Sequence, residues 1–69
     1  MYFFALTGRE QEVVRLVCDR QSNKEIAAKL GVTEGTVKAH LHAIYDKLKV
    51  RSRIELIALA HRGEPLRTP

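Results

Sequence analysis

Apolar residues recur along this 69-residue chain at intervals of three and four, the spacing that places side chains on one face of an α-helix. The clearest run comprises Val37, Leu41, Ile44 and Leu48. At about 100° per residue, these side chains fall in a stripe roughly 60° wide. Similar spacings predict four helices, at about residues 7–20, 22–31, 33–48 and 52–63. Because no stretch alternates with period two, strands are not expected, and the predicted fold is all-α.

Polar residues mark the starts of these helices. In a capping box, a Ser or Thr accepts a hydrogen bond from the backbone three residues later, and a Glu at that later position reaches back. Three such pairs occur: Thr7 and Glu10, Ser22 and Glu25, Ser52 and Glu55. Thr33 is the expected cap of the third helix, although Thr rather than Glu follows three residues later. Gly31 suits the left-handed backbone that ends a helix, and Gly63 with Pro65 should end the last one.

The second and third predicted helices are separated by a turn of only a few residues. Ala27 is small enough to let the next helix pass close over it, and Gly31 supplies the positive φ of the turn. Val37 and Leu41 then fill the space between the two helices. This Ala-x3-Gly-x5-Val spacing is typical of a helix-turn-helix. The sequence therefore predicts a compact four-helix domain containing that motif.

The chain's positive charge is concentrated in one stretch. Twelve Lys and Arg residues against eight Asp and Glu give a net charge of +4. Residues 38–53 contain one acid, Asp46, and five bases: Lys38, Lys47, Lys49, Arg51 and Arg53. This stretch alone accounts for the excess, which points to a polyanion such as nucleic acid. On charge alone, a solvated basic surface would explain the pattern equally well.

The face of the third helix opposite Val37 carries short or polar side chains near its start. This face includes Gly35, Lys38, Ala39 and His42. A helix that enters the major groove needs slim first turns and donors for base edges, such as a lysine for guanine O6 or N7. His42 can donate or accept a hydrogen bond, and Ala39 can contact a thymine methyl group. Phosphate contacts are expected from bases where this helix ends and the next begins: Lys47, Lys49, Arg51 and Arg53.

Other chemistries lack the residues that they need. The single cysteine, Cys18, cannot form an internal disulfide or provide a zinc ligand set, so we expect a reduced, cytoplasmic chain. His40 and His42 point about 160° apart on a helix, which disfavours a metal pair. No carboxylate pair, nucleophile–base pair or phosphate-binding loop is present. We therefore predict no catalytic residues, no cofactor, no metal site and no membrane partner.

Several motif blocks in order resemble the LuxR/FixJ-type (GerE-like) DNA-binding domain, from about Leu6 to His61. The blocks are Leu6-Thr7-x-Arg9-Glu10, Ser22-Asn23-Lys24-Glu25-Ile26-Ala27, Thr36-Val37-Lys38-x-His40-Leu41-x-x-Ile44-x-x-Lys47-Leu48 and Arg51-x-Arg53. The resemblance implies a four-helix domain of bacterial transcription regulators, such as response regulators of two-component systems. In that family the domain usually follows a receiver or ligand-sensing domain. Its third helix reads the major groove, and two copies pair on inverted half-sites largely through the last helix.

Position by position, the resemblance assigns base reading to Lys38, Ala39 and His42, with Gly35 on the same face. It assigns phosphate contacts to Thr36 and Lys47, and the cap Thr33 is predicted to join that set. Three residues depart from the family pattern: Arg20 and Lys49 stand where glycine is frequent, and Gln21 stands where an apolar residue is frequent. The first substitution is expected to strain or shift the turn after the first helix. The second adds a charge near the phosphates.

The last helix carries two apolar stripes. Ile54, Ile57 and Ala58 lie on one side, whereas Leu56, Leu59 and Ala60 lie on another. A four-helix core needs only one of these stripes. Ile57 and Ala58 are therefore candidates for a dimer contact, and their assignment to the core remains the alternative.

These observations predict a non-enzymatic domain that binds double-stranded DNA as a homodimer. Its expected extent is residues 6–63, with residues 1–5 as a linker or N-terminal extension and 64–69 as a C-terminal tail. A different class remains open, in which the helix-turn-helix is a protein-interaction module whose basic surface docks an acidic partner. Binding to arbitrary duplex DNA at low salt would distinguish the two.

Overall fold

The computed structural model describes residues 6–62 and contains four α-helices and no strand within that range. The helices are α1 (Gly8–Cys18), α2 (Asn23–Leu30), α3 (Glu34–Leu48) and α4 (Arg53–Arg62). The all-α, four-helix prediction is confirmed. The linker and tail assignments, and the expected end of the last helix at Gly63 and Pro65, lie outside the described residues.

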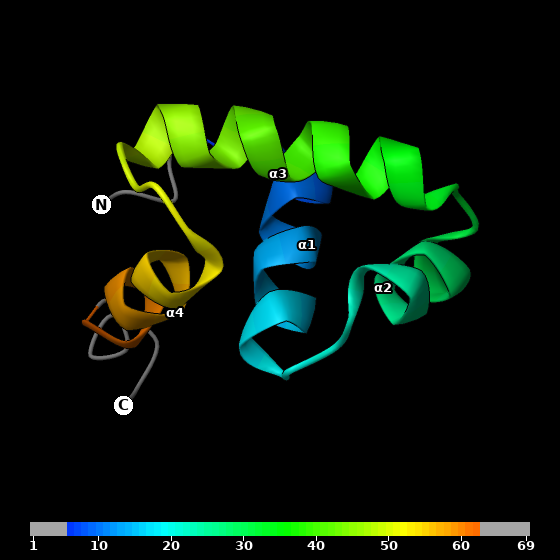
Figure 1. The fold of residues 1–69 in the computed structure, drawn as a ribbon, viewed down its shortest axis with the longest axis horizontal. Helices are drawn as coiled ribbons and strands as arrows, with labels where there is room; N and C mark the ends of the chain where they lie inside the picture. Colours follow the sequence, from blue (N-terminus) through cyan, green and yellow to red (C-terminus); the bar gives the residue numbers. More distant parts are fainter. Residues whose placement is uncertain (1–5, 63–69) are drawn as a thin grey trace.

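The longest helix, α3, lies along one side of the molecule (Figure 1). Helix α1 runs away from the middle of α3, while α2 lies near the start of α3 and α4 near its end (Figure 1). α1 contacts each of the other three helices, and α2 packs against α3 to form the helix-turn-helix. The arrangement leaves the side of α3 that faces away from α1 uncovered by the other described helices.

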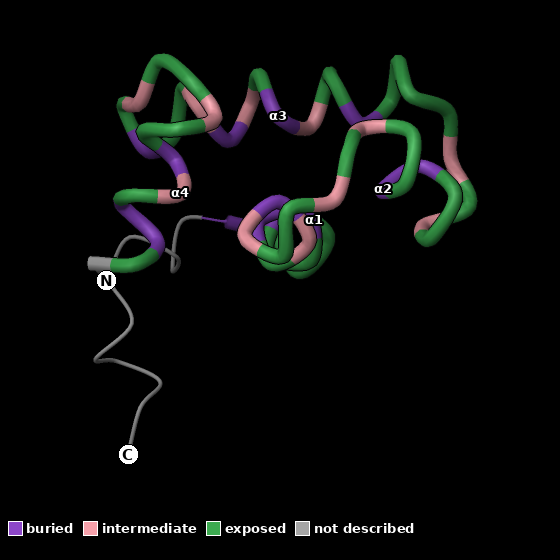
Figure 2. The backbone as a smooth tube through the Cα atoms, turned by 60° about the horizontal axis from the view of Figure 1, so that its bottom comes forward, coloured by how far each residue is buried: buried purple, intermediate pink, exposed green. Residues whose placement is uncertain are grey.

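The core contains the apolar stripe that the sequence predicted for the third helix. Val37 and Ile44 are fully buried, and Leu41 and Leu48 are nearly so. In Figure 2 the buried positions of α3 lie along the side toward α1 and the exposed ones along the opposite side. The remaining helices contribute a larger set of buried apolar residues: Val13, Val14, Val17, Ile26, Ala27, Leu56, Leu59 and Ala60.

Local hydrogen bonds explain where the helices begin. The complete capping boxes predicted at Thr7 and Ser22 are both present, and the Thr33 hydroxyl caps α3. The box predicted at Ser52 forms only in part. The Ser52 hydroxyl accepts a hydrogen bond from the Glu55 backbone N–H at 3.2 Å. The Glu55 carboxylate instead accepts from the Arg51 backbone N–H at 2.7 Å, one residue further from the helix.

The first three helices end with one backbone motif, in which a left-handed residue follows the helix and the next N–H returns to a carbonyl inside it. At the end of α2 this residue is Gly31, with φ of 70° as predicted. The other two are Arg20, with φ of 62°, and Lys49, with φ of 59°. For non-glycine residues this conformation costs roughly 1–2 kcal/mol. α1 therefore ends at Cys18, slightly before the predicted residue 20, because Arg20 leaves the helical region of φ.

The turns are nevertheless well bonded. After α1, the Gln21 N–H donates to the Leu16 carbonyl at 3.1 Å, and the Arg20 N–H donates to the Val17 carbonyl at 2.9 Å. After α3, the Val50 N–H donates to the Tyr45 carbonyl at 3.0 Å. Both turns thus keep their backbone hydrogen bonds although Arg20 and Lys49 take the left-handed conformation that favours glycine. No helix within residues 6–62 combines the length and the apolar content that crossing a membrane requires.

Candidate nucleic-acid interface

The outer face of α3 presents the residues that the sequence predicted for base reading. Gly35, Lys38, Ala39 and His42 are all exposed. Val37, on the opposite side of the helix, is fully buried. The apolar stripe therefore fixes the helix against α1 and α2, and this fixes the direction in which the polar face points. The structure brings these residues together on one uncovered helix face.

The first turn of α3 carries two neighbouring hydroxyl groups. The Thr33 Oγ1 atom accepts a hydrogen bond from the Thr36 backbone N–H at 3.1 Å and lies 3.0 Å from the Thr36 Oγ1 atom. Both residues are exposed. Hydroxyl groups at a helix N-terminus, where the helix dipole favours negative charge, are suited to contact a phosphate group.

The basic residues predicted to contact phosphate differ in how firmly the protein holds them. Lys49 and Arg51 are exposed, and no ion pair to either side chain occurs among residues 6–62. Arg53, in contrast, is half-buried, and its Nη2 atom donates to the Asn23 Oδ1 atom at 2.8 Å. It also donates to the Gln21 carbonyl at 3.4 Å. Arg53 thus connects the start of α4 to the start of α2.

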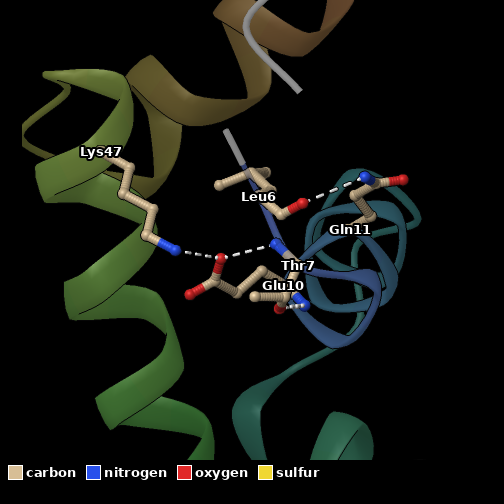
Figure 3. Close-up of polar contacts among 5 residues, drawn as sticks. All are labelled: Leu6, Thr7, Glu10, Gln11 and Lys47. Atoms are coloured by element: carbon tan, nitrogen blue, oxygen red, sulfur yellow. Dashed lines mark hydrogen bonds and ion pairs between the residues drawn. The ribbon is translucent and has the colours of Figure 1, made fainter. Parts of the chain in front are cut away.

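Lys47 is held in a similar way, by Glu10 at the start of α1 (Figure 3). The Lys47 Nζ atom donates to the Glu10 Oε1 atom at 2.8 Å. The same oxygen accepts a hydrogen bond from the Thr7 backbone N–H at 2.9 Å. Glu10 is 6 % exposed and is the one buried charged residue in the described part of the chain. Sequence reasoning identified the cap but missed the ion pair, whose partners are 37 residues apart.

The surroundings of Glu10 favour its charged form. The hydrogen bond from Lys47, followed by the hydrogen bond from the Thr7 backbone, lowers the pKa of Glu10 below its ordinary value of 4.5. Burial acts in the opposite direction, and the charge of Lys47 and the nearby His40 act to lower the pKa further. The net direction means that Glu10 stays ionised at neutral pH, and the Lys47 ammonium keeps its partner.

This pKa shift predicts an acid-sensitive contribution to stability. A carboxyl group whose pKa is lowered by folding stabilises the folded state above its unfolded pKa, and this contribution disappears as the pH falls through the lower folded pKa. We therefore expect the Glu10 contribution to be constant above about pH 4.5 and to decline below it. Urea unfolding at a series of pH values measures this decline. Glu10→Gln should reduce its slope, whereas Glu25→Gln should retain it, because that variant leaves the Glu10–Lys47 pair intact.

The two apolar stripes of α4 have different environments. Leu56, Leu59 and Ala60 are buried and complete the core. On the other side, Ile54 is 79 % exposed and Ala58 is exposed. Ile57 is half-buried and lines a shallow hollow together with residues of α1, of the turn before α2 and of α4: Val17, Arg20, Gln21, Ser22 and Arg53. The predicted dimer-contact residues thus lie on an apolar surface that the described part of the chain leaves open.

Clusters of three or more potential metal ligands do not occur in residues 6–62. Cys18 is half-buried and packs against the core. The arrangement of the described residues is that of a helix-turn-helix domain. Its third helix has an exposed polar face, and basic residues lie beside that face.

Comparison with known proteins places this domain in a family. The luxR family of bacterial regulatory proteins (GerE) matches residues 5–60. The chain belongs to this family, and the resemblance seen in the sequence is confirmed. It is thus a LuxR-type helix-turn-helix domain of transcriptional regulators.

Individual relatives agree with this assignment. The transcriptional regulatory protein DesR of Bacillus subtilis is 48 % identical over 52 residues, which cover 75 % of this chain and 26 % of DesR. The nitrate/nitrite response regulator protein NarL of Escherichia coli K12 is 39 % identical over 57 residues, covering 83 % of this chain and 26 % of NarL. The structure of the response regulator StyR superposes with a TM-score of 0.83 at 48 % identity, covering 88 % of this chain and 31 % of StyR. The chain therefore spans less than a third of the length of each of these three regulators.

Proposed function

We propose that this chain is a non-enzymatic, sequence-specific DNA-binding domain, acting in the cytoplasm as the output domain of a bacterial transcription regulator. Its third helix would enter the major groove of double-stranded DNA. The observation that supports this proposal most directly is the exposed face of α3, where Lys38 and His42 lie on the side away from the fully buried Val37. Gly35 and Ala39 leave that face slim enough to approach base edges.

The residues around this face would supply the contacts that are independent of sequence. Thr33 and Thr36 would contact one phosphate region at the start of α3. At its end, phosphate contacts would come from Lys47, Lys49, Arg51 and Arg53. The charge excess of the chain lies in this region. Such contacts supply most of the affinity for arbitrary DNA and set the register in which the base-reading residues act.

We further propose that the domain binds DNA as a homodimer on inverted half-sites. The supporting observation is the open apolar side of α4, which includes Ile57 and Ala58 next to the strongly exposed Ile54. An exposed apolar patch of this kind suits a contact between two copies related by a twofold axis. The matched parts of NarL and StyR are only 26 % and 31 % of those regulators, which supports a receiver or sensing domain as a partner in a longer chain of a two-component system.

Titration with salt tests this function. If each protomer neutralises about four phosphates, the logarithm of the binding constant should fall with the logarithm of salt concentration at a slope near −3.6. Fluorescence anisotropy with a labelled duplex of arbitrary sequence measures this slope. A protein-interaction module that docks an acidic partner would show negligible affinity for duplex DNA at low salt, and that result would reject the proposal. Selection from a random duplex pool then tests the dimer, because a twofold site should yield palindromic sequences.

A further inference from the structure

Glu10 differs from the other carboxylates that cap helices in this protein. The capping box of α2 contains the equivalent residue, Glu25, whose carboxylate accepts from the Ser22 backbone N–H at 2.7 Å. Glu25 is exposed, whereas Glu10 is buried and also accepts a hydrogen bond from Lys47. Capping a helix therefore requires neither the burial nor the ion pair of Glu10. The contact with Lys47 is an additional feature that connects α1 to the end of α3.

The contact with Glu10 uses only part of the hydrogen-bonding capacity of the Lys47 ammonium. An ammonium group has three N–H donors, and the contact with Glu10 uses one of them. The Lys47 side chain remains 36 % exposed. Lys47 lies in the last turn of α3, two residues before the exposed Lys49. Two ammonium donors thus remain on a side chain that solvent still reaches, which leaves room for a partner outside the protein.

Holding a lysine in advance reduces the entropy that is lost when it binds. A free lysine side chain samples many rotamers, and fixing it on a phosphate restricts them. An anchored lysine has lost much of this freedom before the phosphate arrives. A carboxylate beside it also has an opposite effect, because its negative charge repels DNA. The two effects predict opposite changes in affinity when the carboxylate is removed.

We infer that Glu10 is a positioning residue for DNA binding, which holds the Lys47 ammonium so that its remaining donors contact a DNA phosphate. This inference rests on the proposed function and concerns how one of its phosphate contacts is prepared. Glu10 itself does not touch DNA. Its carboxylate stays charged because two donors converge on one of its oxygen atoms.

The test compares Glu10→Met with Glu25→Met. Both substitutions remove one negative charge and one capping carboxylate, but only the first removes the anchor of Lys47. Affinity for a labelled duplex of arbitrary sequence is measured by anisotropy at low salt. We expect Glu10→Met to weaken binding about three- to tenfold. Glu25→Met should bind as tightly as the unaltered chain or slightly more tightly.

A second pair of variants separates positioning from general damage. In a Lys47→Gln background there is no ammonium to position, so adding Glu10→Met should cause no further weakening. If the weakening persists in that background, Glu10 acts through the fold and the inference is wrong. All variants are compared at a temperature below their unfolding transitions, measured by circular dichroism. Should Glu10→Met fail to fold, Glu10→Gln retains the capping acceptor and should change affinity in the same direction by a smaller factor.

The outcomes also separate this inference from the proposed function. If the unaltered chain does not bind duplex DNA at low salt, the proposed function fails. If it binds, and Glu10→Met binds equally or more tightly, the function stands and the positioning role of Glu10 is rejected. In that case the carboxylate would only neutralise the charge of Lys47.

Discussion

Val37→Asp is expected to unfold the domain. Val37 is fully buried, and it lies in the apolar stripe that packs α3 against α1 and α2. A carboxylate there would be buried without a partner, which costs more than about 4 kcal/mol. Small domains have a total stability of only roughly 5 kcal/mol, so the folded state would be lost or nearly lost. Loss of the helical circular dichroism signal at neutral pH measures this effect.

Ala39→Asp is the matched control, because it adds the same charge to the same helix only two residues away. Ala39 is exposed, so the carboxylate remains in water. The substitution costs about 0.7 kcal/mol in helix propensity and should leave the domain folded. It should nevertheless weaken DNA binding by placing a negative charge on the proposed base-reading face. If Val37→Asp were as stable as Ala39→Asp, the assignment of the two faces of α3 would be wrong.

The features that could be predicted from the sequence are those set by residues three or four apart. The buried stripe from Val37 to Leu48 follows from helix geometry alone. The caps at Thr7 and Ser22 follow from contacts within one turn, and Gly31 follows from the steric freedom of glycine. The exposed face of α3 was predictable for the same reason, since burying one side of a helix exposes the other.

The features that could not be predicted depend on residues distant in sequence or on competition between local rules. Nothing near Lys47 indicates that its partner is Glu10, and nothing near Arg53 indicates Asn23. At Ser52 the local rule held for the hydroxyl but not for Glu55, because a second backbone N–H was within reach. Arg20 shows the same limit, since it adopts a left-handed conformation that an arginine rarely takes.

These distant contacts change the interpretation of the basic region. Charge alone suggested an array of equivalent lysine and arginine side chains. The structure instead divides them into side chains with no ion pair among the described residues, such as Lys38 and Lys49, and side chains hydrogen-bonded to the protein, such as Lys47 and Arg53. Side chains without such a partner can adjust to a bound molecule. Side chains that the protein already hydrogen-bonds present their charge at a fixed position. The proposed interface therefore combines an adaptable part with a preorganised part.

Lys38→Ala is expected to weaken specific DNA binding by about 1–3 kcal/mol, which corresponds to about 5- to 150-fold in Kd. Lys38 is exposed on the slim face of α3, where it can donate to a guanine in the major groove. Because its side chain does not contribute to the core, the helical signal and the unfolding transition should stay close to those of the unaltered chain. The dissociation constant is measured by anisotropy on a duplex selected from a random pool.

Lys29→Ala removes the same charge from an exposed position on α2 that lies outside the proposed interface. It should change the affinity for the selected duplex far less than Lys38→Ala. The proposed role also requires the loss at Lys38 to be larger on the selected duplex than on arbitrary DNA, since a base contact discriminates between sequences. Lys47→Gln, which removes a phosphate contact, should weaken both duplexes by a similar factor. If Lys38→Ala also affected the two duplexes equally, Lys38 would be a phosphate contact and α3 would enter the groove with a different face.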